Sequence, residues 1–185
     1  PKYKLQIYAE YFHPVIHNLL VLKETKLEDI KTVRSHSQAI GQCQNIIKKN
    51  NLKPIISADT AGSAKYVSEK KDKTDSALAS SLAAKIYDLE IIARNVEDDP
   101  ANVTRFLVMG KEIRHPVLNK KKYITSCIFR VKSKPAALYK CLGGFATNNV
   151  NLCKLESFSA KNSFEQVNFF IDIEGHIEEP MVQKS

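Results

Sequence analysis

The chain reads Asn102-Val103-Thr104-Arg105-Phe106 where a polar turn over residues 97–101 passes into an apolar run that ends at Met109. Successive residues of a strand point to opposite faces, so a strand here places Thr104 and Phe106 on one face and Arg105 on the other. Ligands of α/β proteins usually bind at the mouth of the sheet, where such a strand end lies. The stretch therefore predicts a hydroxyl group that is presented to a ligand. The alternative is a structural strand with an arginine on the surface.

Strand and helix patterns alternate along the first 110 residues. Runs rich in β-favouring residues predict strands over residues 3–12, 14–22, 31–35, 54–58, 89–93 and 103–109. Apolar residues at helical spacing, together with capping residues, predict helices over residues 37–49, 59–70 and 75–87. This alternation indicates an α/β layered fold.

A second region follows a polar stretch over residues 111–122, which contains Pro116 and a lysine run and is typical of a linker. Beyond it, the pattern predicts a strand over residues 123–131, a helix over 135–148, and strands over 150–157 and 164–174. This β-α-β-β order is the beginning of a βαββαβ arrangement, which would need one more helix and strand.

The composition disfavours several classes of protein. The 185 residues carry a net charge of +8, but the lysine runs lie in three separate places without interleaved aromatic residues, unlike a nucleic-acid surface. Solvated loops and an anionic small-molecule substrate are both compatible with this charge. No apolar run reaches the roughly 18 residues of a membrane span. The four cysteines form no C-x-x-C pair and mostly have apolar neighbours, which favours reduced thiols in a cytoplasmic protein.

Two helix starts carry groups that suit an anion. Ser35-His36-Ser37-Gln38 precedes the first, and Asp59-Thr60-Ala61-Gly62-Ser63 opens the second. Free backbone N–H groups and the helix dipole favour anions at such positions, although ordinary N-capping explains either site taken alone. Together with Thr104 and Arg105 at a third strand end, they predict one cleft that holds a small polyanion.

Segments along nearly the whole chain resemble the prephenate dehydratase family in order and spacing. In the first region they are residues 10–19, 35–39 with Gln42 and Cys43, 59–64 and 102–106. In the second region residues 134–139, 151–157 and 170–176 resemble the ACT regulatory domain of that family. The resemblance implies the second lobe of a two-lobed, periplasmic-binding-like catalytic domain over residues 1–110. It further implies a linker over 111–122 and a partial, ferredoxin-like βαββ ACT domain over 123–185, without the family's earlier half-domain and without the last helix and strand of the ACT domain.

The resemblance assigns the family's function to residues of the first region. The resemblance implies a cytoplasmic lyase that converts prephenate to phenylpyruvate in phenylalanine biosynthesis, with no metal or cofactor. It implies catalytic roles for Thr104 and Arg105 and substrate contacts for Ser35, Gln42, Asp59, Thr60 and Phe106. Chemically, Thr104 is expected to donate a hydrogen bond or proton to the departing hydroxyl. Arg105 is expected to bind a carboxylate or, from the opposite face of the strand, to brace Thr104, and Phe106 to pack in the core beside the site.

The ACT resemblance implies phenylalanine as an allosteric effector, bound at Ala136, Ala137, Leu138, Asn151, Glu156 and Ser157. The family's Gly-Ala-Leu signature is Ala136-Ala137-Leu138 here, and its Glu-Ser-Arg-Pro signature is Glu156-Ser157-Phe158-Ser159. A methyl group at Ala136 would crowd an effector that approaches a glycine backbone, so weak feedback inhibition is expected. ACT sheets commonly pair through their edges, so a homo-oligomer is expected for a complete protein, whereas the isolated 185 residues are expected to be poorly active.

The sequence is also compatible with two other classes of function. One is a non-catalytic module that senses a small molecule such as an amino acid, and the less favoured one is a basic nucleic-acid binder. A metal-binding pair of His13 and His17, which are four residues apart, is disfavoured because Pro14 is incompatible with the helix that this spacing requires.

Overall fold

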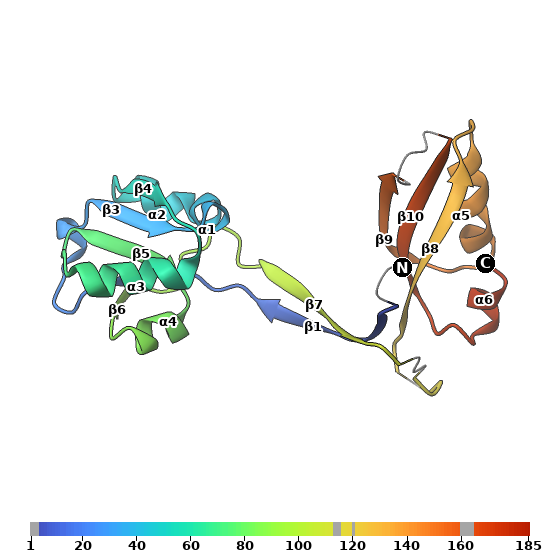
Figure 1. The fold of residues 1–185 in the computed structure, drawn as a ribbon, viewed down its shortest axis with the longest axis horizontal. Helices are drawn as coiled ribbons and strands as arrows, with labels where there is room; N and C mark the ends of the chain where they lie inside the picture. Colours follow the sequence, from blue (N-terminus) through green and yellow to red (C-terminus); the bar gives the residue numbers. More distant parts are fainter. Residues whose placement is uncertain (1–3, 113–115, 120, 160–164) are drawn as a thin grey trace. The chain divides into compact units, whose positions relative to one another are not determined.

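The computed structural model describes residues 4–112, 116–119, 121–159 and 165–185. They form two units, one over Glu10–Phe106 and the other made of the described residues on either side of it. The division falls within β1 (Gln6–Pro14) and β7 (Val103–Gly110), which pair in a two-stranded sheet (Figure 1). Residues 113–115 and 120 of the predicted linker, residue 3 of the first predicted strand and residue 164 of the last predicted strand lie outside the described residues.

A five-stranded sheet organises the unit over Glu10–Phe106. Its strands run in the order β4-β3-β5-β2-β6; β3 is parallel to β4 and β5, whereas β2 is antiparallel to β5 and β6. The strands are β2 (Asn18–Val21), β3 (Thr32–Ser35), β4 (Lys53–Ile56), β5 (Asp75–Ala79) and β6 (Glu90–Ala93). The helical elements of this unit are η1 (Leu27–Asp29), α1 (Ser37–Gln42), α2 (Gln44–Lys49), α3 (Thr60–Lys70) and α4 (Ser81–Ile86).

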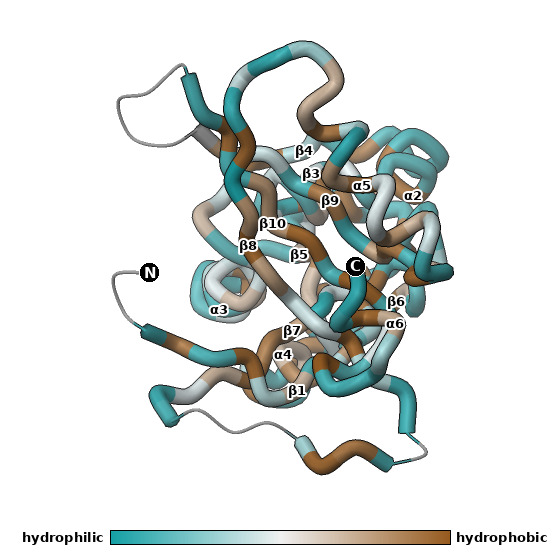
Figure 2. The backbone as a smooth tube through the Cα atoms, turned by 90° about the vertical axis from the view of Figure 1, so that its right-hand side faces the viewer, coloured by the Kyte–Doolittle hydropathy of each residue, from teal (hydrophilic) through white to brown (hydrophobic). Residues whose placement is uncertain are grey.

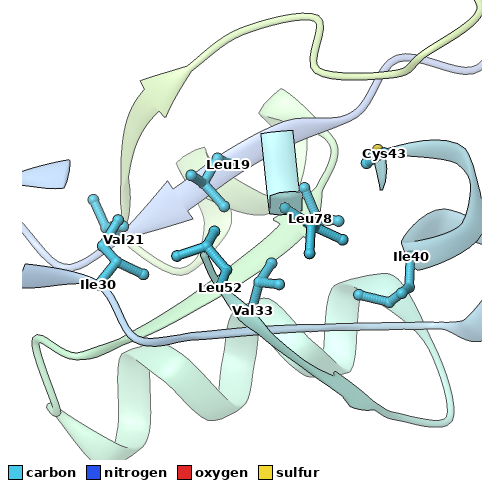
Figure 3. Packing of buried hydrophobic residues seen from close by; sticks show 9 residues of the cluster. Leu19, Val21, Ile30, Val33, Ile40, Cys43, Leu52 and Leu78 are labelled. Carbon is cyan, nitrogen blue, oxygen red and sulfur yellow. The ribbon is translucent and has the colours of Figure 1, made fainter. Parts of the chain in front are cut away.

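Alternate residues of the central strands enter two separate cores. Leu19 and Leu78 pack on one face of the sheet with Ile40 from α1 (Figure 3). Ile47 from α2 belongs to the same cluster. Leu20 packs on the opposite face with apolar residues of α3 and α4. Each fully buried leucine side chain contributes about 2 kcal/mol, so helices are held on both faces of the sheet and the predicted α/β class is confirmed.

The prediction of a helix over residues 75–87 is wrong. Residues Asp75–Ala79 form the central strand β5, and α4 begins at Ser81. Ser80 caps this helix, because its hydroxyl accepts a hydrogen bond from the Ala83 amide at 3.2 Å. All five residues of β5 are buried between β3 and β2. A short strand that is buried on both faces lacks the alternating pattern, so its sequence cannot be distinguished from that of a buried helix.

The predicted helix over residues 37–49 is divided into α1 and α2 at Cys43, where φ is −127° and ψ is 36°. The Asp98 carboxylate accepts hydrogen bonds from the amides of Gln44 and Asn45, at 2.8 and 3.0 Å. An acidic side chain from a distant loop thus caps a new helix start. The apolar spacing does not reveal the break because Ile40, Cys43 and Ile47 still share one face.

The second unit contains a three-stranded antiparallel sheet in the order β8-β10-β9. Its elements are β8 (Ile124–Lys132), α5 (Ala137–Thr147), β9 (Leu152–Ser159), β10 (Gln166–Glu174) and α6 (Pro180–Gln183). Ile171 and Ile173 form the core with Val150 and contact Phe145 of α5. In Figure 2 the apolar residues of β10 appear as brown segments of the tube. The predicted β-α-β-β order is confirmed, and α6 was not predicted.

The other predicted strands are present with shifted ends. Among the helices of the described residues, none has the length and the apolar character that a membrane crossing requires.

Candidate active site

A pocket of about 350 Å³ opens in the unit over Glu10–Phe106. His36 and Ala58, which follow the parallel strands β3 and β4, lie in its lining, so the pocket is at the carboxyl ends of those strands, where α/β sheets commonly bind ligands. The lining residues are Val15, His17, His36, Gln38, Ala39, Gln42, Ala58, Asp59, Thr60, Asn102 and Thr104. Four predicted site residues therefore meet in one pocket: Gln42, Asp59, Thr60 and Thr104.

Strand β7 presents Thr104 to the pocket. Asn102 lies two residues earlier and lines the same pocket, as the alternation of side chains along a strand requires. The Asn102 backbone is held on both sides: its N–H donates to the Asp99 carbonyl at 3.2 Å, and its carbonyl accepts from the Val15 amide at 2.9 Å. The start of β7 is thereby fixed.

Arg105 and Phe106 lie outside this lining. Arg105 Nε donates to Glu10 Oε2 at 2.6 Å, with the two side chains 27% and 29% exposed. This ion pair between β7 and β1 supports the bracing interpretation of Arg105. Phe106 is 54% exposed and its ring meets that of His13, so the expectation that it packs in the core is wrong. The physical reason is that β1 and β7 form a ribbon of their own, from which Phe106 projects.

His17 and Gln42 form a hydrogen-bonded pair in the pocket, with 3.1 Å between Nε2 and Oε1. The His17 side chain is buried, at 6% exposure, so its ring is held in place. When Nε2 donates, the Gln42 carbonyl oxygen is occupied, and the amide N–H₂ group of Gln42 stays available to a ligand acceptor.

The loop between β6 and β7 holds this pair. The Val96 amide donates to the His17 carbonyl at 2.9 Å, and the Glu97 carboxylate accepts from the His17 amide at 2.9 Å. The Asp98 amide donates to the Gln42 carbonyl at 2.7 Å. The acidic turn that precedes β7 in the sequence therefore positions two residues of the pocket.

Both predicted helix starts border the pocket, and each is capped by its own side chain. His36 Nδ1 accepts from the Gln38 amide at 3.3 Å, and Asp59 Oδ1 accepts from the Gly62 amide at 2.5 Å. A Cβ atom at residue 62 would lie 2.7 Å from Asp59 Oδ2, so glycine permits this close approach. The N-capping alternative is confirmed at both starts, although His36, Gln38, Asp59 and Thr60 also line the pocket.

Ser35 does not reach the pocket lining. It is fully buried, and its hydroxyl donates to the Leu78 carbonyl of the adjacent strand at 2.7 Å. The structure thus gives no support to the predicted substrate contact of Ser35, whose neighbour His36 takes that place in the lining.

His17, His36, Gln38 and Asn102 line the pocket but were not among the individual substrate contacts expected from the sequence, although the helix start over residues 35–38 was expected to border the cleft. For Asn102 the sequence did offer a usable signal: it stands two residues before Thr104, and an extended chain directs residues two apart to the same side. For His17 the neighbouring sequence gives no such signal, because its contact with Gln42 forms only in the folded chain. In the described part of the chain, no group of three or more His, Cys, Asp or Glu side chains is arranged to hold a metal ion.

Cys43 is fully buried at the break between α1 and α2. Burial, together with the negative charges of Asp98 and Glu97, raises the pKa of its thiol from an ordinary value of 9.0 to about 12. The group is therefore a neutral thiol at pH 7 and a poor nucleophile.

A second pocket, of about 300 Å³, lies in the other unit. It is lined by Val131, Lys132, Ser133, Lys134, Pro135, Ala137, Leu138, Val167 and Phe169. Two predicted effector residues, Ala137 and Leu138, belong to this lining, whereas Ala136, Asn151, Glu156 and Ser157 do not. Glu156 instead forms an ion pair with Lys154 at 3.1 Å. Ala136 is the N-cap of α5 in the left-handed conformation, with φ 62° and ψ 10°, which favours glycine.

Comparison with known proteins agrees with these features. The sequence profile of the prephenate dehydratase family matches residues 1–114. The chain is 40% identical to a bifunctional N-acyl-homoserine lactone acylase/prephenate dehydratase of Komagataeibacter europaeus over 185 residues, which cover all of this chain and 66% of that protein. It is 39% identical to a prephenate dehydratase of Methanocaldococcus jannaschii over 178 residues, covering 94% of this chain and 63% of that protein. A crystal structure of prephenate dehydratase from Arthrobacter aurescens in complex with L-Phe matches with a TM-score of 0.85 at 27% identity, over 97% of this chain and 60% of that one.

The α/β lobe with a polar pocket at its strand ends and the separate βαββ unit define a class of α/β proteins in which a ligand-sized pocket lies in one unit and an ACT-like sheet forms the other. Within that class, the chain belongs to the prephenate dehydratase family. It spans less than two thirds of the length of the two curated relatives described above.

Proposed function

We propose that this chain forms part of an enzyme that converts prephenate to phenylpyruvate with release of carbon dioxide and water. The observation that carries the proposal is the convergence of Thr104 with Gln42, Asp59 and Thr60 in one pocket. These residues come from three separate segments of the family's sequence pattern. Residues 1–110 would supply this catalytic part.

The residues of the pocket suit the chemistry of this reaction. The bond between the ring and its carboxylate breaks, the electron pair enters the ring, and the carbon–oxygen bond to the hydroxyl breaks, so that an aromatic ring forms. Because the substrate itself supplies most of the driving force, the protein has to orient it and help hydroxide to leave, and the hydroxide takes up a proton from solvent to become the released water. Thr104 donates a hydrogen bond to the departing oxygen, while the Gln42 amide and the Thr60 hydroxyl hold substrate oxygens. No step requires a metal or a cofactor.

Residues 123–185 would supply regulation and assembly. Support comes from the related Arthrobacter aurescens enzyme, which was crystallised with L-Phe, and from the pocket that Ala137 and Leu138 line. Phenylalanine is the proposed effector, with Ala136, Asn151, Glu156 and Ser157 as further contacts. Pairing of the edge strands β8 and β9 between copies would give a homo-oligomer. Four free cysteines fit a cytoplasmic protein.

A phenylpyruvate assay tests the proposed activity. Prephenate is supplied to the product of the longest reading frame that encodes this chain, and phenylpyruvate is measured with the wild type and with Thr104→Val. The proposal expects turnover in the wild type and a loss of at least about a hundredfold in the variant. Wild-type protein that binds prephenate without converting it would favour the alternative of a sensing module.

Hydrolysis of N-acyl-homoserine lactones is a second candidate, because the Komagataeibacter europaeus relative bears both names. Acyl transfer needs a hydroxyl nucleophile beside a base, and the pocket does hold two threonines and two histidines. The hydrogen bonds of these histidines, however, go to Gln42 and to the Gln38 amide. The dehydratase reaction is therefore favoured, and the release of homoserine lactone from an N-acyl substrate by the same protein would reverse this preference.

A further inference from the structure

Asn102 carries a buried polar atom without a partner. Its Nδ2 group is shielded from solvent and makes no hydrogen bond with any described residue. An unpaired buried donor is costly and rare in folded proteins, so its presence calls for an explanation. In a residue that lines a pocket, an acceptor on a bound ligand provides that explanation.

The Asn102 backbone is fixed, whereas its amide group can turn. Hydrogen bonds to Asp99 and Val15 hold the main chain on both sides. The amide rotates about its soft terminal torsion. Since Nδ2 is unpaired in the described structure, turning it toward a ligand breaks no hydrogen bond that this group donates.

The position of Asn102, which immediately precedes β7, indicates which part of a substrate it meets. Asn102 and Thr104 both line the pocket, and residues two apart in an extended chain are separated by about 6.5–7 Å. With Thr104 at the departing hydroxyl on one end of the substrate ring, Asn102 reaches the opposite end. That end carries the pyruvyl side chain, whose carboxylate is retained in phenylpyruvate.

The described residues that line the pocket include no lysine or arginine, and their amide and hydroxyl donors belong to Gln38, Gln42, Thr60, Asn102 and Thr104. A neutral amide can hold the retained carboxylate without placing a cation beside the carboxylate that must leave. A cation there would stabilise the ground state and slow the loss of carbon dioxide.

We propose that Asn102 is a substrate-binding residue whose amide donates to the pyruvyl carboxylate. This inference rests on the proposed function. Because the contact is the same before and after the reaction, it contributes uniform binding, which lowers KM without changing kcat.

The test uses two Asn102 variants and one control in the full-length protein. Asn102→Leu keeps the branched shape of the side chain and removes the donor, and Asn102→Asp places a carboxylate there. The expected result is a KM for prephenate raised about 10- to 100-fold by Asn102→Leu, with kcat within a few-fold of the wild type. Asn102→Asp should raise the KM for prephenate further than Asn102→Leu does, because the introduced carboxylate repels the pyruvyl carboxylate of the substrate. Asn50→Ala, which removes an amide that donates to the Ile46 carbonyl outside the pocket, should leave KM unchanged.

Thermal unfolding separates this role from a structural one. Removing an unpaired buried donor should leave the Tm of Asn102→Leu unchanged or raised. A KM equal to that of the wild type, or a lowered Tm with kcat and KM both impaired, would overturn the inference.

Direct binding of phenylpyruvate, measured by calorimetry, distinguishes failure of this inference from failure of the proposed function. If the wild type makes no phenylpyruvate but binds it, and Asn102→Leu binds it at least about tenfold more weakly, the proposed function fails and the role of Asn102 stands. Equal binding by both proteins, or no binding by either, overturns the role of Asn102 whatever the outcome of the activity assay.

Discussion

Arg105 Nε donates to the carboxylate of Glu10 at 2.6 Å, which ties β7 to β1 directly beside Thr104. Arg105 and Thr104 point to opposite faces of the strand, so the ion pair restrains β7 from the face that Thr104 does not use. The cation that follows the candidate catalytic hydroxyl is thus engaged within the protein, and its effect on Thr104 is through the position of the strand.

The Thr104 hydroxyl should act mainly in the transition state. Thr104→Val keeps the shape and removes the hydroxyl, so kcat should fall about a hundredfold or more with KM nearly unchanged. Thr104→Ser should retain much of the activity because it keeps the donor. Steady-state kinetics of phenylpyruvate formation check both outcomes, and a Val variant with normal turnover would reduce Thr104 to a packing residue.

Removal of the Glu10 charge should loosen β7. Glu10→Gln leaves Arg105 without the carboxylate to which its Nε donates, and the free energy of unfolding should fall by about 1 kcal/mol, as for a partly exposed charged hydrogen bond. The kcat should fall by less than in Thr104→Val, because the hydroxyl is displaced and not removed. Urea unfolding and kinetics on one preparation test this, with Glu69→Gln as the control, since Glu69 pairs with Lys65 on the surface.

The Asp98 carboxylate should stabilise both α2 and the Gln42 site. Asp98→Asn can accept fewer hydrogen bonds from the amides of Gln44 and Asn45, so stability should fall by about 1 kcal/mol and KM should rise. The control is Asp88→Asn, which removes an exposed ion pair with Lys23 and should have little effect on either quantity. An Asp98→Asn variant with wild-type stability would show that the helix break at Cys43 does not depend on this cap.

Cys43 should make the protein less stable in alkali. Its pKa is raised from 9.0 to about 12 in the folded state, so above pH 9 the unfolded chain releases a proton that the folded chain retains. Stability should therefore fall as pH rises from 9 towards 12. Cys43→Ala should flatten this slope, whatever its effect on stability at pH 7, whereas Cys141→Ala should not, because Cys141 is exposed. Urea unfolding at several pH values between 8 and 10 measures the slope, and an identical slope in the Cys43 variant would contradict the argument.

Ala136→Gly should stabilise the ACT unit. A non-glycine residue at φ 62° is strained, and relief of that strain should exceed the added flexibility of the unfolded chain by about 0.5–1 kcal/mol. Ala146→Gly, inside α5, should instead destabilise by a similar amount. Chemical denaturation of the two variants and the wild type measures both changes in the free energy of unfolding. Calorimetry with phenylalanine on the same proteins tests whether the methyl group also weakens effector binding, as the sequence led us to expect.

The sequence by itself determined features that depend on a few neighbouring residues. Strand alternation places Thr104 and Arg105 on opposite faces of β7, and the Asp59 cap with Gly62 three residues later defines the start of α3. The β-α-β-β order of the second unit also follows from local periodicity. Local steric and hydrogen-bonding preferences suffice for such features.

Only the tertiary structure decided the features that depend on distant partners. Residues 75–79 became a strand because β2 and β3 bury them on both sides. The helix break at Cys43 depends on Asp98, 54 residues away from Gln44. Ser35 was withdrawn from the pocket by a hydrogen bond to Leu78, 43 residues away, and His17 was brought to it by Gln42, 25 residues away. Local sequence patterns do not specify such partners, because the free energy of burial and pairing depends on which segments the fold brings together.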